Sequence, residues 1–262
     1  MSESYSDVKK LNRIKSRLEA LYPIKKLNEK LTRTVREFEK FVFVRHKHED
    51  CDLADLIPKS ELDFFRRFFA GYETLLEQEK AKDLIEHRCT AKHCLYKDRV
   101  LSRTFSYAES EGKMAGIKKT SKVLVVGSGP FPETAIGYAL AFGCEIICLE
   151  KRGPFVKRSR KVVEKLGLGK NISIVHGTTT KLKDLKFDKV LVTALAVPKS
   201  EILGDLRKSN CDIILRTSFG SSKLVYSPVD ADDLKDFEVK AKFVRLGKNF
   251  TSSILVRKKG RN

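Results

Sequence analysis

The sequence predicts an α/β protein in which a helical amino-terminal domain precedes a parallel β-sheet. Two observations predict this fold class. Apolar residues recur at intervals of three and four over the first 120 residues, and from Ser121 onward short β-branched runs alternate with helical segments. The 262 residues, 41% of them apolar, can bury the core of one large domain or two small ones. We place the boundary in the segment KMAGIKKTSK, which gives domains of residues 1–118 and 119–262.

The clearest predicted helix runs over residues 60–87, with Ser60 able to cap its first turn. At 100° per residue, Glu79 projects into the middle of the apolar stripe of this helix, whereas Glu73 and Glu77 fall outside it. Glu79 is therefore either the exposed end of the helix or a carboxylate that lines a cavity, where desolvation would suit it to act as a general base. The stripe consists of Phe65, Phe68, Phe69, Tyr72, Leu75 and Leu76.

Seven strands are predicted in the second domain. Five of the strand-like runs are each followed by a loop or a helix, which is typical of a parallel sheet with helices on both faces. The last two are joined by a short loop and predict an antiparallel hairpin at one edge. The runs cover residues 122–126, 145–149, 172–175, 189–193, 212–217, 239–246 and 251–258. A seven-stranded sheet of this kind is class I methyltransferase-like (Rossmann-like), an analogy of fold that says nothing about chemistry.

A glycine-rich turn joins the first strand of this sheet to a helix. Glycines at this position let the backbone approach a ligand at the carboxyl edge of the sheet. Pro132 stands where a dinucleotide-binding turn has its third glycine, which argues against NAD and favours a nucleoside without a pyrophosphate, such as the adenosine of S-adenosylmethionine. The candidate binding residues are Gly127, Ser128, Gly129, Pro130, Pro132 and Thr134.

Glu150 ends the second strand, 21 residues beyond Gly129. An acidic residue there commonly accepts hydrogen bonds from ribose hydroxyls. The alternative is a surface glutamate that pairs with Lys151 or Arg152.

Composition limits the partners and the compartment. The 53 basic and 34 acidic residues give a net charge of +19, which favours an anionic partner. No zinc-finger, homeodomain or aromatic RNA-binding signature supports nucleic acid, so a carboxylate-bearing small molecule is the milder explanation. No run of 18 uncharged apolar residues predicts a membrane span, and the amino terminus lacks the apolar segment of a signal peptide. The six scattered cysteines indicate reduced thiols and a cytoplasmic protein. If the chain self-associates, we expect a homodimer.

Residues 127–134 match the GSGP-x-P-x-T signature of nicotianamine synthases, and the chain resembles the shorter archaeal and bacterial members of that family, including synthases of opine metallophores. Further matches are RIKSRLEA, EQEKAKDLIE, TALAVPK and RTSFGSSKLVYSPVDADDL. The resemblance implies transfer of the aminocarboxypropyl (aminobutyrate) arm of S-adenosylmethionine to an amino-acid amine, with release of 5′-methylthioadenosine and formation of a metal-chelating product. The alternatives are an S-adenosylmethionine-dependent methyltransferase that acts on a small molecule or RNA, and a non-catalytic binding module.

The resemblance also implies catalytic residues in a reaction chamber between the two domains. Glu79 takes the position of the family's glutamate that orients and deprotonates the attacking amine. Tyr107 and Tyr96 lie in the stretch where the family places a tyrosine facing the same chamber. We favour Tyr107, although either residue could belong to the core.

The remaining implied contacts concern the donor and the substrate. Ala194, Leu195 and Ala196 follow the fourth strand and are small or apolar, which would let backbone groups reach the amino-acid part of the donor. Arg216 ends the fifth strand and could clamp a carboxylate with two hydrogen bonds, unless it forms a structural ion pair. Tyr226 is expected in a strand beside the site.

Four residues close together could suggest a metal site. Their spacing fits no standard zinc motif, so we expect no bound metal. They are His87, Cys89, His93 and Cys94.

Overall fold

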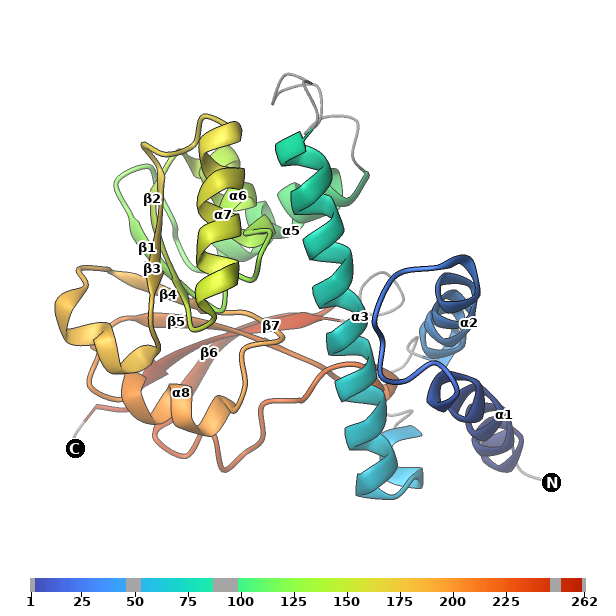
Figure 1. Ribbon diagram of the computed structural model, residues 1–262. Helices are drawn as coiled ribbons and strands as arrows, with labels where there is room; N and C mark the ends of the chain where they lie inside the picture. The colour runs from blue at the N-terminus through green and yellow to red at the C-terminus, as the bar shows by residue number, and fades with distance from the viewer. Residues whose placement is uncertain (1–2, 46–52, 87–98, 246–250, 261–262) are drawn as a thin grey trace. The chain divides into compact units, whose positions relative to one another are not determined.

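The computed structural model describes residues 3–45, 53–86, 99–245 and 251–260, with no account of the side chains of residues 3–5, 45 and 99–104 (Figure 1). The chain divides into two compact units, which are described separately. Unit 1 comprises Met1–Leu76, Thr217–Pro228 and Val244–Ser252; unit 2 comprises Glu77–Arg216, Val229–Phe243 and Ser253–Asn262. The boundary between the two units falls within a helix, between Leu76 and Glu77, and each unit contains several segments of the chain. The boundary predicted from the sequence is a single division at residues 118–119, and it stays a prediction.

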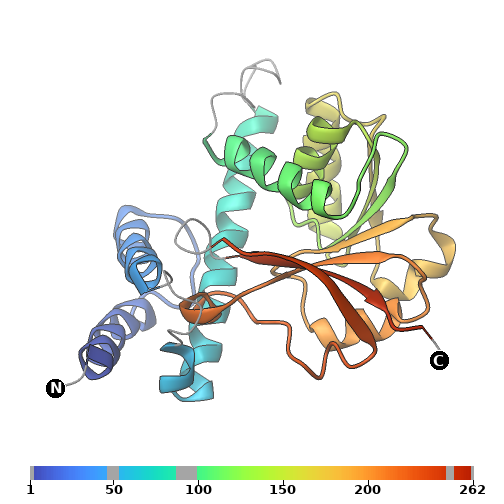
Figure 2. The same cartoon turned by 180° about the vertical axis from the view of Figure 1, so that it is seen from behind.

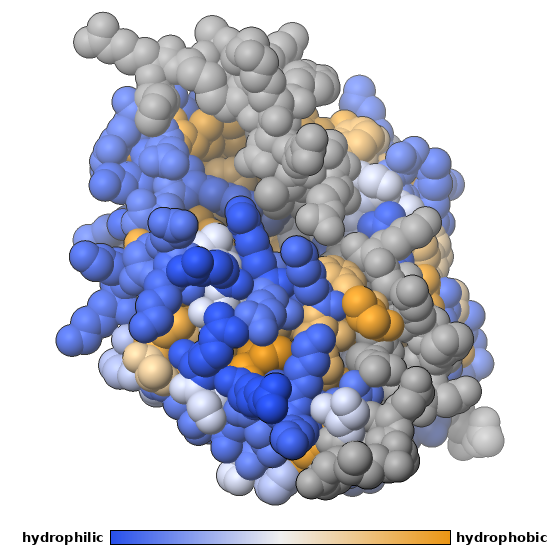
Figure 3. Space-filling view, turned by 90° about the vertical axis from the view of Figure 1, so that its right-hand side faces the viewer, coloured by the Kyte–Doolittle hydropathy of each residue, from blue (hydrophilic) through white to orange (hydrophobic). Residues whose placement is uncertain are grey.

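Unit 1 is built from helices with apolar inner faces. It contains α1 (Glu3–Glu19), α2 (Glu29–Arg45), the 3₁₀ helices η1 (Leu53–Leu56) and η3 (Gly220–Leu224), and the first part of α3 (Lys59–Glu86). Asn28 begins α2, because its Oδ1 accepts a hydrogen bond of 2.9 Å from the backbone N–H of Leu31. Phe38 of α2 stacks on Phe65 of α3 with ring centroids 5.1 Å apart. Hydrophilic side chains predominate on the face of the molecule in Figure 3, with small hydrophobic areas between them.

Unit 2 contains the predicted seven-stranded sheet (Figures 1 and 2). Its strand order is β3-β2-β1-β4-β5-β7-β6. β1 to β5 pair in parallel and β6 pairs antiparallel to β7, which confirms the predicted arrangement and its terminal hairpin. The strands are β1 (Lys122–Val126), β2 (Glu145–Glu150), β3 (Ile172–His176), β4 (Lys189–Val192), β5 (Asp212–Thr217), β6 (Phe237–Phe243) and β7 (Ser252–Lys258).

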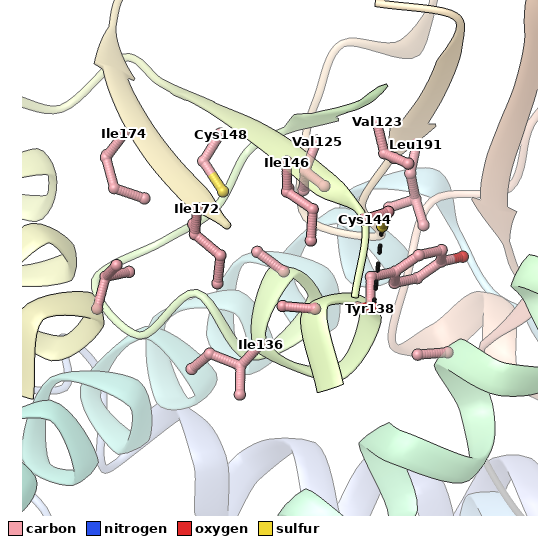
Figure 4. Close-up of a cluster of buried hydrophobic side chains, with 14 of the residues drawn as sticks. Val123, Val125, Ile136, Tyr138, Cys144, Ile146, Cys148, Ile172, Ile174 and Leu191 are labelled. Carbon is pink, nitrogen blue, oxygen red and sulfur yellow. Dashed lines mark hydrogen bonds between the residues drawn. The ribbon is translucent and has the colours of Figure 1, made fainter. Parts of the chain in front are cut away.

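Helices and apolar side chains cover both faces of this sheet. The connecting helices are α5 (Arg99–Met114), α6 (Glu133–Phe142), α7 (Gly153–Lys165) and α8 (Lys199–Leu206), with the 3₁₀ helix η2 (Thr179–Asp184). On one face, side chains of β1, β2 and β3 pack with Ile136 and Tyr138 of α6 (Figure 4). Neighbouring side chains that point to the other face, such as Leu124 and Ile213, are also fully buried. Burial on both faces explains why these strands are nearly continuous apolar runs in the sequence.

Within the described residues, no helix combines the length and the apolar character needed to cross a bilayer. The cysteines among the described residues, Cys144, Cys148 and Cys211, are free thiols. Burial raises the pKa of Cys144 and of Cys211 to about 11. Both thiols are therefore suited to packing rather than to nucleophilic chemistry.

Candidate functional site

The strand order locates the binding edge of unit 2. From β1 the chain adds β2 and β3 on one side, whereas β4 and β5 lie on the other side. Such a reversal creates a crevice at the carboxyl ends of the two central strands, where open α/β sheets bind ligands. The two turns that border this point are the glycine turn (residues 127–132) after β1 and the turn after β4 (residues 193–197, the β4 turn).

The glycine turn needs glycine at two positions. Gly127 and Gly129 have φ angles of +83° and +67°, which residues with a Cβ rarely adopt. A Cβ at Gly127 would lie 2.9 Å from both Thr193 Oγ1 and Ala196 Cβ, and one at Gly129 would collide with the carboxylate of Glu77. The two turns at the edge of the sheet are therefore in close contact, and a carboxylate of α3 lies against the glycine turn.

Glu77, rather than Glu79, brings its carboxylate to the glycine turn. Glu77 is half-buried and its Oε2 lies beside Gly129, whereas Glu79 is exposed. Of the two interpretations left open for Glu79, the structure shows the exposed residue and not the carboxylate that lines a cavity. If the glycine turn binds a ligand as the sequence predicts, a carboxylate beside its backbone is well placed to accept a proton from the bound group.

The apolar stripe drawn from the sequence includes Glu79 because the buried face of α3 rotates along the helix. In the part that belongs to unit 1, the buried residues cluster around the direction of Phe65. In the part that belongs to unit 2, the buried residues Ala81 and Leu84 lie at about 160° and 100° from Phe65, and Glu77 lies at about 120°. A single apolar stripe drawn from the aromatic residues therefore extends over Glu79 and misses Glu77.

A buried carboxylate holds the glycine turn in place. Glu150 is only 3% exposed, and its Oε2 accepts a hydrogen bond of 3.0 Å from the backbone N–H of Gly129. Its Oε1 accepts one of 2.9 Å from the backbone N–H of Arg152. Charge-assisted bonds to backbone N–H groups are strong, so Glu150 fixes the turn whether or not it also contacts a ribose.

Ser128 carries an unsatisfied polar group within the glycine turn. Its side chain is 8% exposed, and its Oγ has no hydrogen-bond partner among the described residues. A buried hydroxyl without a partner costs free energy, which a bound ligand can recover by completing the hydrogen bond. Pro130 and Pro132 are also buried, and Pro132 directly precedes α6.

We expect Gly129→Ala to weaken the binding of S-adenosylmethionine, for two reasons. A φ of +67° costs a residue with a Cβ about 1–2 kcal/mol, and the new methyl group would displace Glu77. Isothermal titration calorimetry with S-adenosylmethionine measures the effect. Gly167→Ala is a matched control, because Gly167 has a φ of +68° but its Cβ would meet no atom within 4 Å. Equal loss of binding in both variants would contradict the assignment of the glycine turn.

The β4 turn packs on the glycine turn and contains the predicted donor-binding residues. Ala194 is buried, and Leu195 and Ala196 are half-buried. The Oγ1 of Thr193 donates to the carbonyl oxygen of Gly127 at 2.9 Å and, more weakly, to that of Val126 at 3.2 Å. The backbone of this turn is thus held at the carboxyl edge of the sheet.

Lys199, at the start of α8, is a buried residue that the sequence analysis did not single out. It is 4% exposed, and its Nζ donates to the carbonyl oxygens of Thr193 at 2.5 Å and Ala194 at 3.3 Å. Burial, and secondarily the charge of Arg216, lowers its pKa from 10.5 to about 7, partly offset by Asp233. Lys199 ends the TALAVPK segment, but nothing in that segment indicates its burial, because lysines are usually exposed.

The lowered pKa of Lys199 predicts a stability that rises with pH. Between the folded pKa of about 7 and the ordinary value of 10.5, the unfolded chain binds a proton that the folded chain does not. The free energy of unfolding should therefore gain up to about 1.4 kcal/mol per pH unit from this residue across that window. Urea unfolding at pH 7 and pH 10 measures the change. Other groups titrate in the same window, so the contribution of Lys199 is the part that Lys199→Met removes; an unchanged slope in that variant would contradict the assignment.

Arg216 forms a buried ion pair rather than a free clamp for substrate. Its Nε and Nη2 donate to the two carboxylate oxygens of Glu111, at 3.1 and 2.9 Å, and its Nη1 donates to Thr134 Oγ1 at 2.9 Å. Glu111 is fully buried. Burial opposes the charge of Arg216, but Glu111 outweighs it and raises the pKa of the guanidinium. The structural ion pair that the sequence left open is thus the observed state.

Tyr107 belongs to the same buried network. It is 3% exposed, its hydroxyl lies 2.9 Å from Ser253 Oγ, and its ring lies 4.8 Å from Arg216 Cζ. Ser253 Oγ in turn donates to Glu111, and Tyr138 donates to Glu111 at 3.2 Å. A catalytic role for Tyr107 stays a prediction. Tyr96 lies outside the described residues.

Tyr226 lies in unit 1 and not in a strand, so that expectation was wrong. It follows η3, is buried, and donates a hydrogen bond of 2.5 Å to Glu73 Oε1. Its ring packs edge-on against Phe69 with centroids 5.8 Å apart. The segment LVYSP resembles a strand in its composition, but a 3₁₀ turn precedes it and no strand partner is recorded for it in the described sheet.

Over the described residues, no cluster of three or more His, Cys, Asp or Glu side chains could hold a metal ion. The candidate ligands His87, Cys89, His93 and Cys94 lie outside those residues.

Two curated relatives are similar to part of the chain. An L-histidine 2-aminobutanoyltransferase of Yersinia pestis is 31% identical over 98 residues, which are 37% of this chain and 37% of the relative. An L-histidine 2-aminobutanoyltransferase of Pseudomonas aeruginosa (strain UCBPP-PA14) is 25% identical over 170 residues, which are 62% of this chain and 63% of the relative. The chain thus aligns with less than two thirds of the length of either protein.

Solved structures match over nearly the whole chain. MtNAS in complex with MTA and tNA has a TM-score of 0.85 at 26% identity, covering 96% of this chain and 98% of MtNAS. A glutamate-to-glutamine mutant of MtNAS in complex with S-adenosylmethionine has a TM-score of 0.84 at 25% identity, covering 98% and 99% of the two chains. The family model described as nicotianamine synthase protein matches residues 6–262. The chain therefore belongs to the nicotianamine synthase family.

Proposed function

We propose that this protein transfers the 3-amino-3-carboxypropyl group of S-adenosylmethionine to the amine of an amino acid and releases 5′-methylthioadenosine. One observation carries the proposal: the Glu77 carboxylate lies against Gly129, in the turn that would bind the donor. The resemblance of the sequence to nicotianamine synthases and the complexes of MtNAS with MTA and with S-adenosylmethionine support it.

The residues of unit 2 suit a nucleoside donor. The two glycines admit a ligand close to the backbone, and Glu150 holds the turn. The Ser128 hydroxyl, which has no partner within the part of the chain that the structure describes, offers a hydrogen bond. S-adenosylmethionine supplies a sulfonium that activates three carbons, and the one that reacts is the one in line with the nucleophile.

Glu77 supplies the proton acceptor that this reaction needs. At neutral pH the amine of the substrate amino acid is protonated to an ammonium ion, whose nitrogen has no free electron pair. Transfer of one proton to the Glu77 carboxylate would free that pair for attack on the methionine carbon next to sulfur. The new C–N bond forms as the C–S bond breaks, and the electrons of the C–S bond remain on sulfur as methylthioadenosine leaves. A methyl transfer would instead leave S-adenosylhomocysteine.

We do not assign the substrate carboxylates to Arg216, because its guanidinium is paired with Glu111. The net charge of +19 still favours an acceptor that bears carboxylates. The sequence does not identify the acceptor, and glutamate and histidine are both worth testing; the names of the relatives favour histidine. A metal-chelating product, a homodimer and a cytoplasmic location remain part of the proposal.

The decisive assay identifies the nucleoside product. Purified protein is incubated with S-adenosylmethionine and either histidine or glutamate, and the products are separated by liquid chromatography and mass spectrometry. We expect methylthioadenosine and an acceptor heavier by one aminocarboxypropyl group. S-adenosylhomocysteine with a methylated acceptor would overturn the proposal in favour of a methyltransferase.

A further inference from the structure

A buried lysine, Lys199 of α8, contacts the turn at the carboxyl end of β4. Burying an apolar side chain at this position would cost less free energy. Lys199 is 4% exposed, and removing an amine from water is unfavourable unless its donors are satisfied. Its Nζ donates to the carbonyl oxygens of Thr193 and Ala194, which belong to the turn directly preceding α8. An amine donates such bonds in either protonation state, so the contact does not depend on the charge.

The bonds of Lys199 continue to the glycine turn through Thr193. The carbonyl oxygen of Thr193 accepts from Lys199, and its Oγ1 donates to the carbonyl oxygen of Gly127 at 2.9 Å. Its backbone N–H also donates to the carbonyl oxygen of Val126 at 3.2 Å. The Ala196 side chain then packs so close to Gly127 that no Cβ would fit there. Lys199 thus supports the contact between the glycine turn and the β4 turn, which border the point where the strand order reverses.

We propose that Lys199 is a positioning residue for the donor site, which fixes the β4 turn against the glycine turn and so sets the affinity for S-adenosylmethionine. The inference rests on the proposed function, because it assigns these two turns to the donor. Lys199 itself touches only protein carbonyls and need not contact the donor. Its loss would leave the carbonyl oxygen of Ala194 without its described partner and would loosen the turn that packs on Gly127.

The test compares binding of S-adenosylmethionine by isothermal titration calorimetry in Lys199→Met, Lys199→Arg and wild type. We expect Lys199→Met to raise the Kd about tenfold or more, and Lys199→Arg, which keeps the donors, to bind closer to wild type than Lys199→Met. Lys208→Met is the matched control, because Lys208 is exposed just after α8 and should leave the Kd unchanged. A Lys199→Met protein that is folded, has a lower melting temperature and keeps the wild-type Kd would overturn the inference and leave a merely structural role.

A second variant keeps the inference testable if Lys199→Met does not fold. Thr193→Val removes the hydroxyl that joins the same turn to Gly127 while keeping the size of the side chain. We expect it to weaken S-adenosylmethionine binding as well, and a wild-type Kd in this variant would overturn the inference.

Different results would contradict the proposed function and the positioning role of Lys199. Wild-type protein that binds S-adenosylmethionine but forms no methylthioadenosine would contradict the proposed function and leave the positioning role open to the binding comparison. Wild-type protein that forms methylthioadenosine while the variants keep its Kd would contradict the positioning role alone. Wild-type protein that does not bind S-adenosylmethionine would contradict both.

Discussion

Replacing Glu77 by glutamine is expected to slow the formation of methylthioadenosine by about 10²–10⁴-fold, the usual contribution of a general base. Glutamine keeps the shape of the side chain beside Gly129 but cannot accept a proton from an ammonium ion. The measurement is the initial rate at saturating S-adenosylmethionine, with the Kd of the donor determined separately. The rate should fall while the protein still binds the donor.

Glu79→Gln is the matched control for this experiment. It makes the same chemical change two residues further along α3, at an exposed side chain. We expect its rate to stay within about twofold of wild type, since isolated surface substitutions have small effects. If Glu79→Gln were inactive and Glu77→Gln active, the catalytic role that the resemblance implies for Glu79 would be right and the assignment to Glu77 wrong.

The rate of the Glu77→Gln variant should also recover as the pH rises, if the lost function is deprotonation of the acceptor. At higher pH a larger fraction of the acceptor amine is already neutral, so the base is needed less. The ratio of wild-type to variant rate should then shrink between pH 7 and pH 9. A constant ratio would indicate that Glu77 orients the acceptor and does not take its proton.

The contrast between Glu77 and Glu79 shows what periodicity can and cannot predict. The seven strands could be predicted because both faces of the sheet are buried, so each strand is a short apolar run with a turn after it. The glycine turn could be predicted because its backbone conformation requires glycine at fixed positions. The face of α3 could not, since one helix serves two units and changes its buried side between them.

Long-range pairing explains why the burial of Glu111 could not be predicted. Glu111 lies in the segment SYAESEGK, which is typical of a solvated helix surface, and nothing nearby in the sequence indicates that it is fully buried against Arg216, 105 residues away. Lys199 is a different case, because its partners Thr193 and Ala194 lie only six and five residues before it. It follows proline in a turn, where lysines are usually exposed, so nothing in the sequence indicates that it is buried.

Arg216→Met is expected to lower the free energy of unfolding by about 3–5 kcal/mol, because it leaves the fully buried Glu111 without its cationic partner. The double variant Arg216→Met/Glu111→Gln removes both charges and should recover part of that loss. Urea unfolding followed by circular dichroism gives the free energy of unfolding of the wild type, the single variant and the double variant. Lys122→Met is the matched control: Lys122 pairs with Glu145 at 2.9 Å, but the two side chains are 47% and 50% exposed, so its loss should cost at most about 1 kcal/mol.

The same variants separate the two roles considered for Arg216. A guanidinium that clamps the substrate would leave stability nearly unchanged when removed and would raise the KM for the acceptor, and Glu111→Gln would not restore it. The observed geometry predicts the opposite result, because Nε and Nη2 donate to Glu111 and Nη1 donates to Thr134. Arg216→Met should lower the free energy of unfolding. Any activity that it loses should be recovered together with stability in the double variant. The carboxylates of the substrates would then have to be bound by other cations of this basic chain.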